Sequence, residues 1–471
     1  MKKFRILWID DDWSIVDSLQ YIALQNIKNN ILATSDDISI ACRESISEGV
    51  AEMLNRENEP YHLIITDLSY DLNNSHNLDY YLIIRKAIEL SIPVVIFSNK
   101  IGKFDLEGLQ SSPLLLGIFE KQNEQKLIET VNNISQFGSL KIIHISDFHF
   151  NSQLLGAAKA AQQVRFEKLL DKLVQENSLK PIDLIIFTGD FATKKQKEDF
   201  EECLYLLKRI VTQTIKDYSR FLVIPGNHDI EWTDFENAIP SLSPGKSYYE
   251  FLCKLYSENF EIIEKYMGFN SNIRTFDEYF HPNSFCWHQI FRDLKIDIIG
   301  LSSVATSPDL KGKGVINESV KKFIENKLNR KRPTSVTIAL IHHNILPPFS
   351  LNPLEEKSSI VNSGEIIELL AKNNCNIILS GHCHDSYLYN FSFSTLIYKG
   401  FSKMKNISYL STGTSGGYVG SLDRAKSFNI INLFSSTNFN ERNISVQPVF
   451  YDSRDQIWTK GEKLNSVIKV N

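Results

Sequence analysis

Five short apolar runs, each followed at once by side chains that bind metals or transfer protons, constrain this chain more than any other feature. In the clearest run, FLVIPGNHD, the apolar stretch ends in Pro-Gly and is followed by Asn227, His228 and Asp229. The other four runs read KIIHISDFH, DLIIFTGD, VTIALIHH and NIILSGHCH. Apolar runs of this length predict buried strands, and open sheets place their chemistry beyond the carboxyl ends of parallel strands. The pattern therefore predicts one sheet edge that gathers carboxylate, carboxamide and imidazole groups.

Length and composition restrict the class of protein. With 471 residues the chain exceeds one ordinary hydrophobic core, which predicts two or three domains. No apolar run is long enough to span a membrane and the first residues lack the pattern of a signal sequence, so we expect a cytoplasmic protein with no membrane partner. Six cysteines without paired spacing favour reduced thiols. The net charge of -5 offers no general cationic surface, which disfavours nucleic acid as a partner without excluding it.

The first segment alternates short apolar runs with longer runs of helical periodicity. Such alternation predicts a doubly wound parallel sheet of the α/β class. Polar residues again stand where the predicted strands end. They are Asp10 and Asp11 after the first strand, Asp67 after the third, Ser98 after the fourth and Lys121 after the fifth.

The order of these five residues resembles that of the receiver domain of two-component response regulators. The resemblance implies a flavodoxin-like sheet, Mg²⁺ held with the help of Asp10 and Asp11, and transfer of a phosphoryl group from a cognate histidine kinase to Asp67. It also implies contacts from Ser98 and Lys121 to that phosphoryl group. A carboxylate attacks phosphorus only when a hard cation and an ammonium group neutralise the oxygens that it approaches.

Two positions in this receiver-like segment, residues 1–137, depart from the family pattern. Ile118 stands where the family has an aromatic residue that signals phosphorylation, and Gln122 stands where it has proline. We therefore expect phosphoacceptance at Asp67 more firmly than the usual output switch. The simpler alternative is that any doubly wound sheet collects acids at its strand ends.

The second segment begins near Gly138 and Ser139, which break the last predicted helix of the first. Its strand-end residues combine carboxylate oxygen, amide oxygen and imidazole nitrogen, the donors that hard and borderline divalent metals bind. The seven candidate ligands are Asp147, His149, Asp190, Asn227, His342, His382 and His384. A pair of metals needs one bridging carboxylate with other ligands on either side, and this set supplies them. The alternative is a set of polar core or capping residues, which would leave many buried polar groups unpaired.

Taken in order, the motifs Asp-Phe-His, Gly-Asp, Gly-Asn-His-Asp, a strand-end His and Gly-His-Cys-His resemble those of the calcineurin-like metallophosphoesterase superfamily, over residues 140–435. The resemblance implies a two-sheet β-sandwich flanked by helices, an αββα arrangement of the α+β class, in a domain that spans residues 138–471. It also implies hydrolysis of phosphomonoesters or phosphodiesters at two divalent metal ions, with Mn, Fe, Zn and Ni as candidates.

The same resemblance implies a role for each candidate residue. The assignments are the first metal to Asp147, His149 and His384, the second to Asn227, His342 and His382, and both metals to the bridging Asp190. His228 would stabilise the transition state or protonate the leaving oxygen, held in orientation by Asp229. Positioned acid catalysis of this kind is typically worth about 10²–10⁴-fold. His343 is expected to pack beside the site and not to bind a metal.

Residues 231–290 follow the Gly-Asn-His-Asp motif and are rich in aromatic residues, which predicts an insertion close to the site. Its rings could stack on a base, which makes nucleotides one candidate class of phosphoester substrate. The alternative, which the spacing favours, is that the rings form the core of a helical cap. The sequences GDFATKK and GNHD lack the Asp-Arg and Glu that protein Ser/Thr phosphatases carry there, so that branch of the superfamily is disfavoured.

Three functions follow from these patterns. The first is a metal-dependent phosphoesterase that is regulated by phosphorylation of its receiver-like domain. The second is a signalling relay or phosphate sink in a two-component pathway, in which phosphoacceptance at Asp67 is the main task. The third is a nuclease of the same superfamily, against which the acidic balance of the chain counts.

Overall fold

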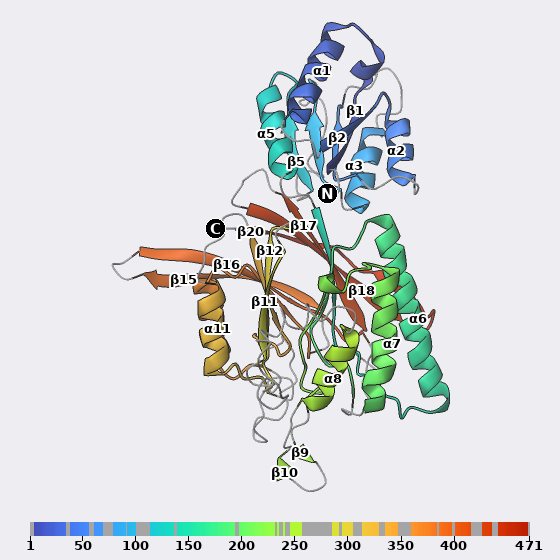
Figure 1. The fold of residues 1–471 in the computed structure, drawn as a ribbon. Coiled ribbons are helices and arrows are strands. Elements are labelled where there is room, and N and C mark those ends of the chain that lie inside the picture. Colours follow the sequence, from blue (N-terminus) through green and yellow to red (C-terminus); the bar gives the residue numbers. More distant parts are fainter. Residues whose placement is uncertain are drawn as a thin grey trace.

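The computed structural model contains an N-terminal α/β unit followed by a larger unit built on two sheets (Figure 1). It describes residues 4–33, 38–55, 61–68, 79–90, 92–99, 114–135, 139–193, 197–230, 233–234, 239–240, 245–256, 285–291, 294–304, 313–328, 335–346, 359–383, 386–397, 401–415, 426–435 and 441–469. Within these ranges, no helix combines the length and the apolar composition that a membrane span requires.

The N-terminal sheet is entirely parallel and has the strand order β2-β1-β3-β4-β5. Its elements are β1 (Phe4–Ile9), η1 (Asp11–Ser14), α1 (Leu19–Leu32), β2 (Ile38–Arg43), α2 (Ile46–Leu54), β3 (Leu63–Thr66), α3 (Asp79–Glu89), β4 (Val94–Phe97), β5 (Leu115–Phe119) and α5 (Glu124–Ser135). Helices α1 and α5 share one buried cluster with the sheet, and α2 and α3 share another, so both faces are covered. The prediction of a doubly wound sheet is confirmed, with the strand order known from flavodoxin-like folds.

The first sheet of the larger unit has the order β19-β18-β17-β6-β7-β8, with β20 paired to β18. Its strands are β6 (Ser139–Ile145), β7 (Leu184–Phe187), β8 (Phe221–Val223), β17 (Ser427–Ser435), β18 (Glu441–Asp452), β19 (Ile457–Lys460) and β20 (Leu464–Lys469). Strands β6, β7 and β8 are parallel, so their carboxyl ends lie at one edge. Helices α6 (Gly156–Leu179), α7 (Lys197–Gln213) and α8 (Lys246–Leu255) pack against this sheet (Figure 1).

The second sheet has the order β11-β12-β13-β14-β16-β15. Its strands are β11 (Cys286–Phe291), β12 (Ile296–Leu301), β13 (Val336–Ile341), β14 (Ile377–Ser380), β15 (Tyr387–Ile397) and β16 (Phe401–Ser411). Helices α11 (Glu318–Leu328) and α12 (Ser363–Lys372) share a separate buried cluster with it and cover its outer face. A short two-stranded ribbon, β9 (Thr233–Asp234) with β10 (Ile239–Pro240), follows β8.

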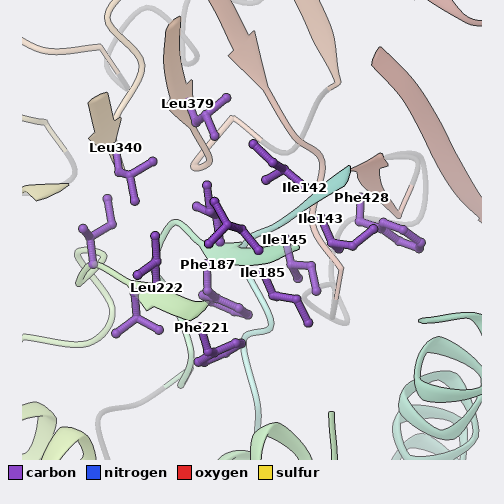
Figure 2. Packing of buried hydrophobic residues seen from close by; sticks show 14 of the residues in the cluster. Ile142, Ile143, Ile145, Ile185, Phe187, Phe221, Leu222, Leu340, Leu379 and Phe428 are labelled. Atoms are coloured by element: carbon purple, nitrogen blue, oxygen red, sulfur yellow. The ribbon is translucent and has the colours of Figure 1, made fainter. Parts of the chain in front are cut away.

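One apolar core joins the two sheets. Figure 2 shows Ile142 of β6, Ile185 of β7 and Leu222 of β8 packed with Leu340 of β13 and Leu379 of β14. Because these residues alternate along their strands with residues that face the helices, each strand is buried on both sides and reads as a continuous apolar run. The predicted arrangement of two sheets between layers of helices is confirmed.

The aromatic residues of the predicted insertion that the structure describes belong to this main core. Tyr248, Phe251, Tyr256 and Trp287 are all buried in it, and Tyr249 packs against it. These rings are therefore core residues, as the spacing favoured, although of the main core and not of a small cap. The last residues of the predicted range lie in β11, which is a strand of the second sheet. The remaining aromatic residues of the insertion fall outside the described ranges.

The N-terminal unit joins the sandwich where β6 begins, four residues after α5 ends at Ser135 (Figure 1). A contact supports this junction, because the Lys463 ammonium group donates to the carbonyl oxygen of Ile88 at 2.8 Å. Ile88 lies in the last turn of α3, whose carbonyl groups lack partners within the helix, so Lys463 caps that helix from the other unit.

Candidate metal centre

The candidate ligands follow the carboxyl ends of five strands of the sandwich, as the sequence predicts. Asp147 and His149 come after β6, Asp190 after β7, Asn227 after β8, and His342 and His382 after β13 and β14. His384 and Asp385 lie outside the described residues. Because β6, β7 and β8 run parallel in one sheet and β13 and β14 run parallel in the other, all these strand ends meet at one edge of the sandwich.

The backbone at this edge is strained. Asp147, His149, Asp190 and His382 have φ angles of 54°, 46°, 61° and 67°, in the left-handed region that side chains other than glycine rarely adopt. Each such residue costs on the order of 1–3 kcal/mol and persists only where the surrounding structure imposes it. Four of the candidate ligands share this strain, which is typical of a functional site.

The glycines of the motifs allow the ligand loops to approach one another. A Cβ atom on Gly226 would lie 2.1 Å from Oδ1 of Asp190, and one on Gly381 would lie 2.5 Å from Oδ2 of Asp147. Any larger residue at either position would displace a candidate ligand. The Gly-Asn-His and Gly-His patterns are therefore required by close packing.

Asp190 occupies the middle of the candidate site. Its Oδ2 atom lies 3.3 Å from Nε2 of His342 and 3.7 Å from Nε2 of His149, while Oδ1 accepts the backbone N–H of His228 at 2.8 Å. The residue is 1% exposed, and within the described part of the chain no hydrogen-bond donor reaches Oδ2. A buried carboxylate oxygen between two imidazoles is the position that a bridging ligand needs.

The donors predicted for the second metal converge on His342. Its Nε2 atom lies 3.1 Å from Oδ1 of Asn227 and 3.2 Å from Nδ1 of His382. On the other side of the ring, Nδ1 lies 2.6 Å from the carbonyl oxygen of Thr188. A carbonyl can only accept, so Nδ1 carries a proton and Nε2 is the nitrogen that faces the site, as in histidines that bind metals.

The donors predicted for the first metal are also close together. Nε2 of His149 lies 3.6 Å from Oδ1 of Asp147, and both residues are at least 96% buried, with exposed fractions of 4% and 0%. His149, Asp190 and His228 form one group in which ligand atoms lie within 4.8 Å of one another, and Asp190, His342 and His382 form a second. Carboxylates and imidazoles in two groups that share Asp190 fit a pair of divalent metals.

The charges of the aspartate and histidine side chains at this edge shift the pKa values of their neighbours. Burial disfavours the charged form of His342, but the charges of Asp190 and Asp147, together with hydrogen bonds to Asp190 and Thr188, outweigh burial and raise the pKa of His342 to about 9. Burial likewise disfavours the charged form of Asp190, but the combined effects of His342, His228 and His149 outweigh burial and lower the pKa of the carboxyl group. Asp190 therefore stays ionised although it is buried, and its negative charge favours the binding of cations.

Asp229 does not have the role that the sequence suggested. Within the described residues its carboxylate accepts from four backbone N–H groups, including those of Asp190 and Gly226 at 2.8 Å each, and no hydrogen bond joins it to the His228 ring. The ring of His228 is oriented instead by Thr193, whose carbonyl oxygen lies 3.0 Å from Nδ1. Asp229 therefore fixes the loops that carry Asp190 and Asn227.

His343 lies beside the site, as expected. It is fully buried, its Nδ1 atom lies 2.8 Å from the Ser303 hydroxyl group, and its ring packs against that of His382 with centroids 4.5 Å apart. Sequence reasoning missed Thr188 and Thr193, whose carbonyl groups orient two histidines. Their position, immediately before Gly189 and shortly after Asp190, was the available signal.

A second cluster of charged groups lies at the carboxyl edge of the N-terminal sheet. The ammonium group of Lys121 is 2.9 Å from Asp10, 2.6 Å from Asp12 and 2.6 Å from Asp67. Burial, together with the charge of Asp67, raises the pKa of Asp10 to about 7 even though Lys121 opposes the shift.

The other polar residues near this edge, Asp11, Asp12 and Ser98, differ in the groups that they contact. Asp12, which was not predicted, contacts Lys121. Asp11 begins η1, and burial, together with the charges of Asp67 and Asp12, raises its pKa. Ser98 is buried directly after β4, where its N–H donates to Phe119. The acid pair of the sequence is thus an acid triplet in which the first and third members face Lys121.

Comparison with known proteins gives one family and several structures. The model of the family described as calcineurin-like phosphoesterase matches residues 140–386. The NAD nucleotidase NadN of Haemophilus influenzae aligns at 15% identity and a TM-score of 0.32, over 70% of this chain and 50% of that one, so this chain spans half the length of that protein. TT1561 of Thermus thermophilus aligns at 11% identity and a TM-score of 0.30, over 69% and 98% of the two chains. A putative 5′-nucleotidase from Staphylococcus aureus aligns at 11% identity and a TM-score of 0.29, over 71% and 55%.

Proposed function

The chain belongs to the calcineurin-like phosphoesterase family over residues 140–386, and from this premise we propose that it hydrolyses phosphoesters at a pair of divalent metals held between its two sheets. It is a hydrolase that acts on phosphoester bonds. The observation that carries the proposal is the position of Asp190, whose buried Oδ2 atom lies between Nε2 of His149 and Nε2 of His342.

The residues of the edge fit two metals. The proposed first site consists of Asp147, His149, Asp190 and His384, and the proposed second site consists of Asp190, Asn227, His342 and His382. Mixed oxygen and nitrogen donors of this kind suit Mn²⁺, Fe, Zn²⁺ and Ni²⁺. When bound, such a pair neutralises the oxygens of a phosphoryl group and promotes the attack of water on phosphorus.

His228 is proposed as the residue that acts on the leaving group. Its backbone N–H binds Asp190 at 2.8 Å and its ring meets that of His149 edge to face, with centroids 4.9 Å apart. Thr193 fixes the protonated Nδ1 atom, so the ring is held without a metal. Its half-buried position beside a candidate ligand suits a group that stabilises the transition state or protonates the leaving oxygen.

The test is hydrolysis of an aryl phosphomonoester, a bis-aryl phosphodiester and a panel of nucleotides, with each candidate metal supplied in turn. Asp190→Asn keeps the shape of the side chain and removes its charge, so we expect loss of activity with the fold retained. Asp171→Asn is the matched control, because Asp171 is an exposed acid on α6. Equal activity of Asp190→Asn and wild type would refute the proposal.

We further propose that Asp67 accepts a phosphoryl group from a histidine kinase and thereby regulates hydrolysis. The support is the contact between Asp67 and Lys121 at 2.6 Å, beside Asp10 and Asp12, at the carboxyl edge of a parallel sheet. Carboxylates grouped around an ammonium group can bind Mg²⁺, and one of them can then accept a phosphoryl group. The contact between Lys463 and Ile88 offers a physical link, because α3 follows the Asp67 loop and ends on the sandwich.

Small phosphoryl donors such as acetyl phosphate, supplied with Mg²⁺, test this second proposal. Intact mass measurement should detect one phosphoryl group on wild type and on Asp17→Asn, an exposed acid that serves as the control, but none on Asp67→Asn. Hydrolysis rates before and after treatment then decide between regulation and a relay or phosphate sink. An unchanged rate on phosphorylated protein would favour the relay.

A further inference from the structure

A polar network of side chains connects two of the loops that carry predicted metal ligands. Its centre is the hydroxyl group of Tyr409 on β16, and its other members are Asn344, Ser380, Tyr387, Cys383 and Ser411. Tyr409 is fully buried, and its ring packs in the cluster that the second sheet shares with α11 and α12. A polar group in such surroundings costs free energy unless it is hydrogen-bonded, so its partners show what the hydroxyl group holds in place.

On one side the hydroxyl group of Tyr409 holds the loop after β13. It donates to Oδ1 of Asn344 at 3.1 Å and accepts the backbone N–H of Ile345 at 3.2 Å. Asn344 and Ile345 follow His342 closely in this loop, and both are buried. The side chain of Tyr409 thus fixes both the backbone and a side chain of the loop that carries His342.

On the other side the same hydroxyl group holds the end of β14. It lies 2.8 Å from Oγ of Ser380, the last residue of that strand. The Ser380 oxygen also lies 3.3 Å from Oδ1 of Asn344, so Tyr409, Ser380 and Asn344 form a closed triangle of buried polar groups. Such a triangle fixes the position of one loop relative to the other, because each member contacts the other two.

A second branch of the network holds the residue that follows His382. The Sγ atom of Cys383 lies 3.2 Å from the hydroxyl oxygen of Ser411 and 3.6 Å from that of Tyr387. The Tyr387 oxygen is in turn 3.5 Å from that of Tyr409. Cys383 is 4% exposed, so its thiol group is enclosed among these hydroxyl groups. The chain is therefore anchored to the network on both sides of His382.

The second group of candidate ligands needs such anchoring. Nε2 of His342 lies 3.2 Å from Nδ1 of His382, although the two residues follow different strands. His382 has a φ angle of 67°, a conformation that a residue other than glycine keeps only where its surroundings impose it. Its N–H donates to Oδ2 of Asp147 at 3.0 Å, which fixes it from the side of the first sheet. The network supplies the constraint from the side of the second sheet.

We propose that Tyr409 is a positioning residue for the second metal site, which holds the loops of His342 and His382 at the separation that one divalent metal requires. The inference rests on the proposed metal centre and adds to it a residue that belongs to none of its motifs. In the described part of the chain, the Tyr409 hydroxyl group forms no hydrogen bond to the loops after β6 and β7. Its removal should therefore change the first metal site little.

Titration calorimetry of the metal-free, full-length protein with Mn²⁺ and, separately, with Zn²⁺ tests the proposal. Wild type should bind two ions per chain. Tyr409→Phe removes only the hydroxyl group, and it should bind one ion as tightly as wild type and the other about 10–100-fold more weakly, the range typical for groups that orient metal ligands.

Tyr256→Phe is the matched control for the loss of a buried hydroxyl group. Tyr256 is 3% exposed, and its hydroxyl group donates to the carbonyl oxygen of Phe221 at 2.6 Å in the main core. Both variants lose a buried hydrogen bond, so both should unfold at a lower temperature than wild type. Only Tyr409→Phe should lose metal affinity, which a purely structural role of Tyr409 does not predict.

Ser380→Ala keeps the proposal testable if Tyr409→Phe does not fold. It removes the partner of Tyr409 at the end of β14 and should weaken the same metal site. In the double variant the loss of affinity should be smaller than the combined losses of the single variants, because both changes break the same contact.

The results separate this inference from the proposed function. If wild type binds two ions but hydrolyses no phosphoester, the proposed function fails, whereas a weakened second site in Tyr409→Phe still supports the positioning role. Equal affinities of wild type, Tyr409→Phe and Ser380→Ala at both sites would overturn the positioning role, even in an active enzyme. A wild type that binds fewer than two ions of either metal would overturn it as well.

Discussion

The carboxylate of Asp229 accepts the backbone N–H of Asp190 at 2.8 Å, and the same carboxylate accepts the N–H groups of Phe191 and Gly226. It therefore ties the loop after β7 to the loop after β8. Burial and the nearby charge of Asp190 raise the pKa of Asp229 to about 7, so the fold keeps this acid in place against an electrostatic penalty. Such a residue determines where its neighbours stand and does not need to contact the substrate.

Asp229→Asn should weaken metal binding, because an amide offers one acceptor oxygen and places an NH₂ group against backbone N–H donors. Replacing a residue that orients a ligand typically costs about 10–100-fold in metal affinity. We expect a loss in that range in a metal titration, with a parallel loss of activity that added metal partly restores. Asp217→Asn removes a similar side-chain to backbone contact at η3 (Tyr218–Arg220) and should leave both quantities unchanged.

His228→Gln should separate catalysis from metal binding. If His228 acts on the leaving group, kcat falls by about 10²–10⁴-fold while the number of bound metals per chain stays that of wild type. The loss should be smaller for substrates with a good leaving group, since these need less protonation. A variant that loses one metal per chain would instead identify His228 as a ligand, in line with its place in the group with His149 and Asp190.

Sequence reasoning predicted the strands and the strand-end residues because both are local signals. Apolar runs such as that of β13 are typical of strands that are buried on both faces. The polar residue that ends each run marks the carboxyl edge of the sheet. The parallel pairing of β6 with β7 then determines that Asp147 and Asp190 meet.

The same reasoning failed where the outcome depends on contacts between distant segments. We expected Asp229 to orient its neighbour His228, but three of its four backbone partners come from the loop after β7, which no local pattern reveals. Asp12 was overlooked because a 3-10 turn, and not an extended strand, decides which of three consecutive acids faces Lys121.

Removal of metal should destabilise the sandwich. Asp147 and Asp190 are both fully or almost fully buried, and the rings of His149 and His342 lie next to their carboxylates. A ligand at about a thousand times its Kd stabilises the native state by about 4 kcal/mol. We therefore expect a chelator to lower the unfolding temperature of wild type and to have little effect on Asp190→Asn. Refilling with Mn²⁺, Zn²⁺, Fe²⁺ or Ni²⁺ and comparing recovery of the unfolding temperature identifies the preferred metal.

Mg²⁺ binding at the N-terminal edge should depend on Asp12 more than on Asp11. Asp12 lies 2.6 Å from the Lys121 ammonium group and forms one group with Asp10 and Asp67. The ring of Trp13, which follows Asp12, packs edge to face on Trp8 at 5.4 Å, so tryptophan fluorescence reports on this turn. A titration of Asp12→Asn should show weaker binding than that of Asp11→Asn. The reverse order would restore the assignment that the receiver resemblance implies.

Glu176 should make stability depend on acid pH. Burial tends to raise the pKa of its carboxyl group, but the charges of Lys141 and Lys460 outweigh burial and lower it from 4.5 to about 2. A folded-state pKa below the unfolded value means that the contribution is complete above pH 4.5 and is lost as the pH falls toward 2. By linkage this contribution is about 3 kcal/mol.

Glu176→Gln is the variant that isolates this effect. At pH 7 it leaves Lys141 buried without a carboxylate, which typically costs about 3–5 kcal/mol, so its unfolding temperature should fall well below that of wild type. The difference between variant and wild type should shrink steadily between pH 4.5 and pH 2, where wild type also loses the charge. Glu167→Gln on the same helix, which breaks an exposed pair with Arg209, should change stability by less than about 1 kcal/mol at any pH. A difference for Glu176→Gln that stayed constant with pH would mean that packing, and not the ion pair, explains the burial of Glu176.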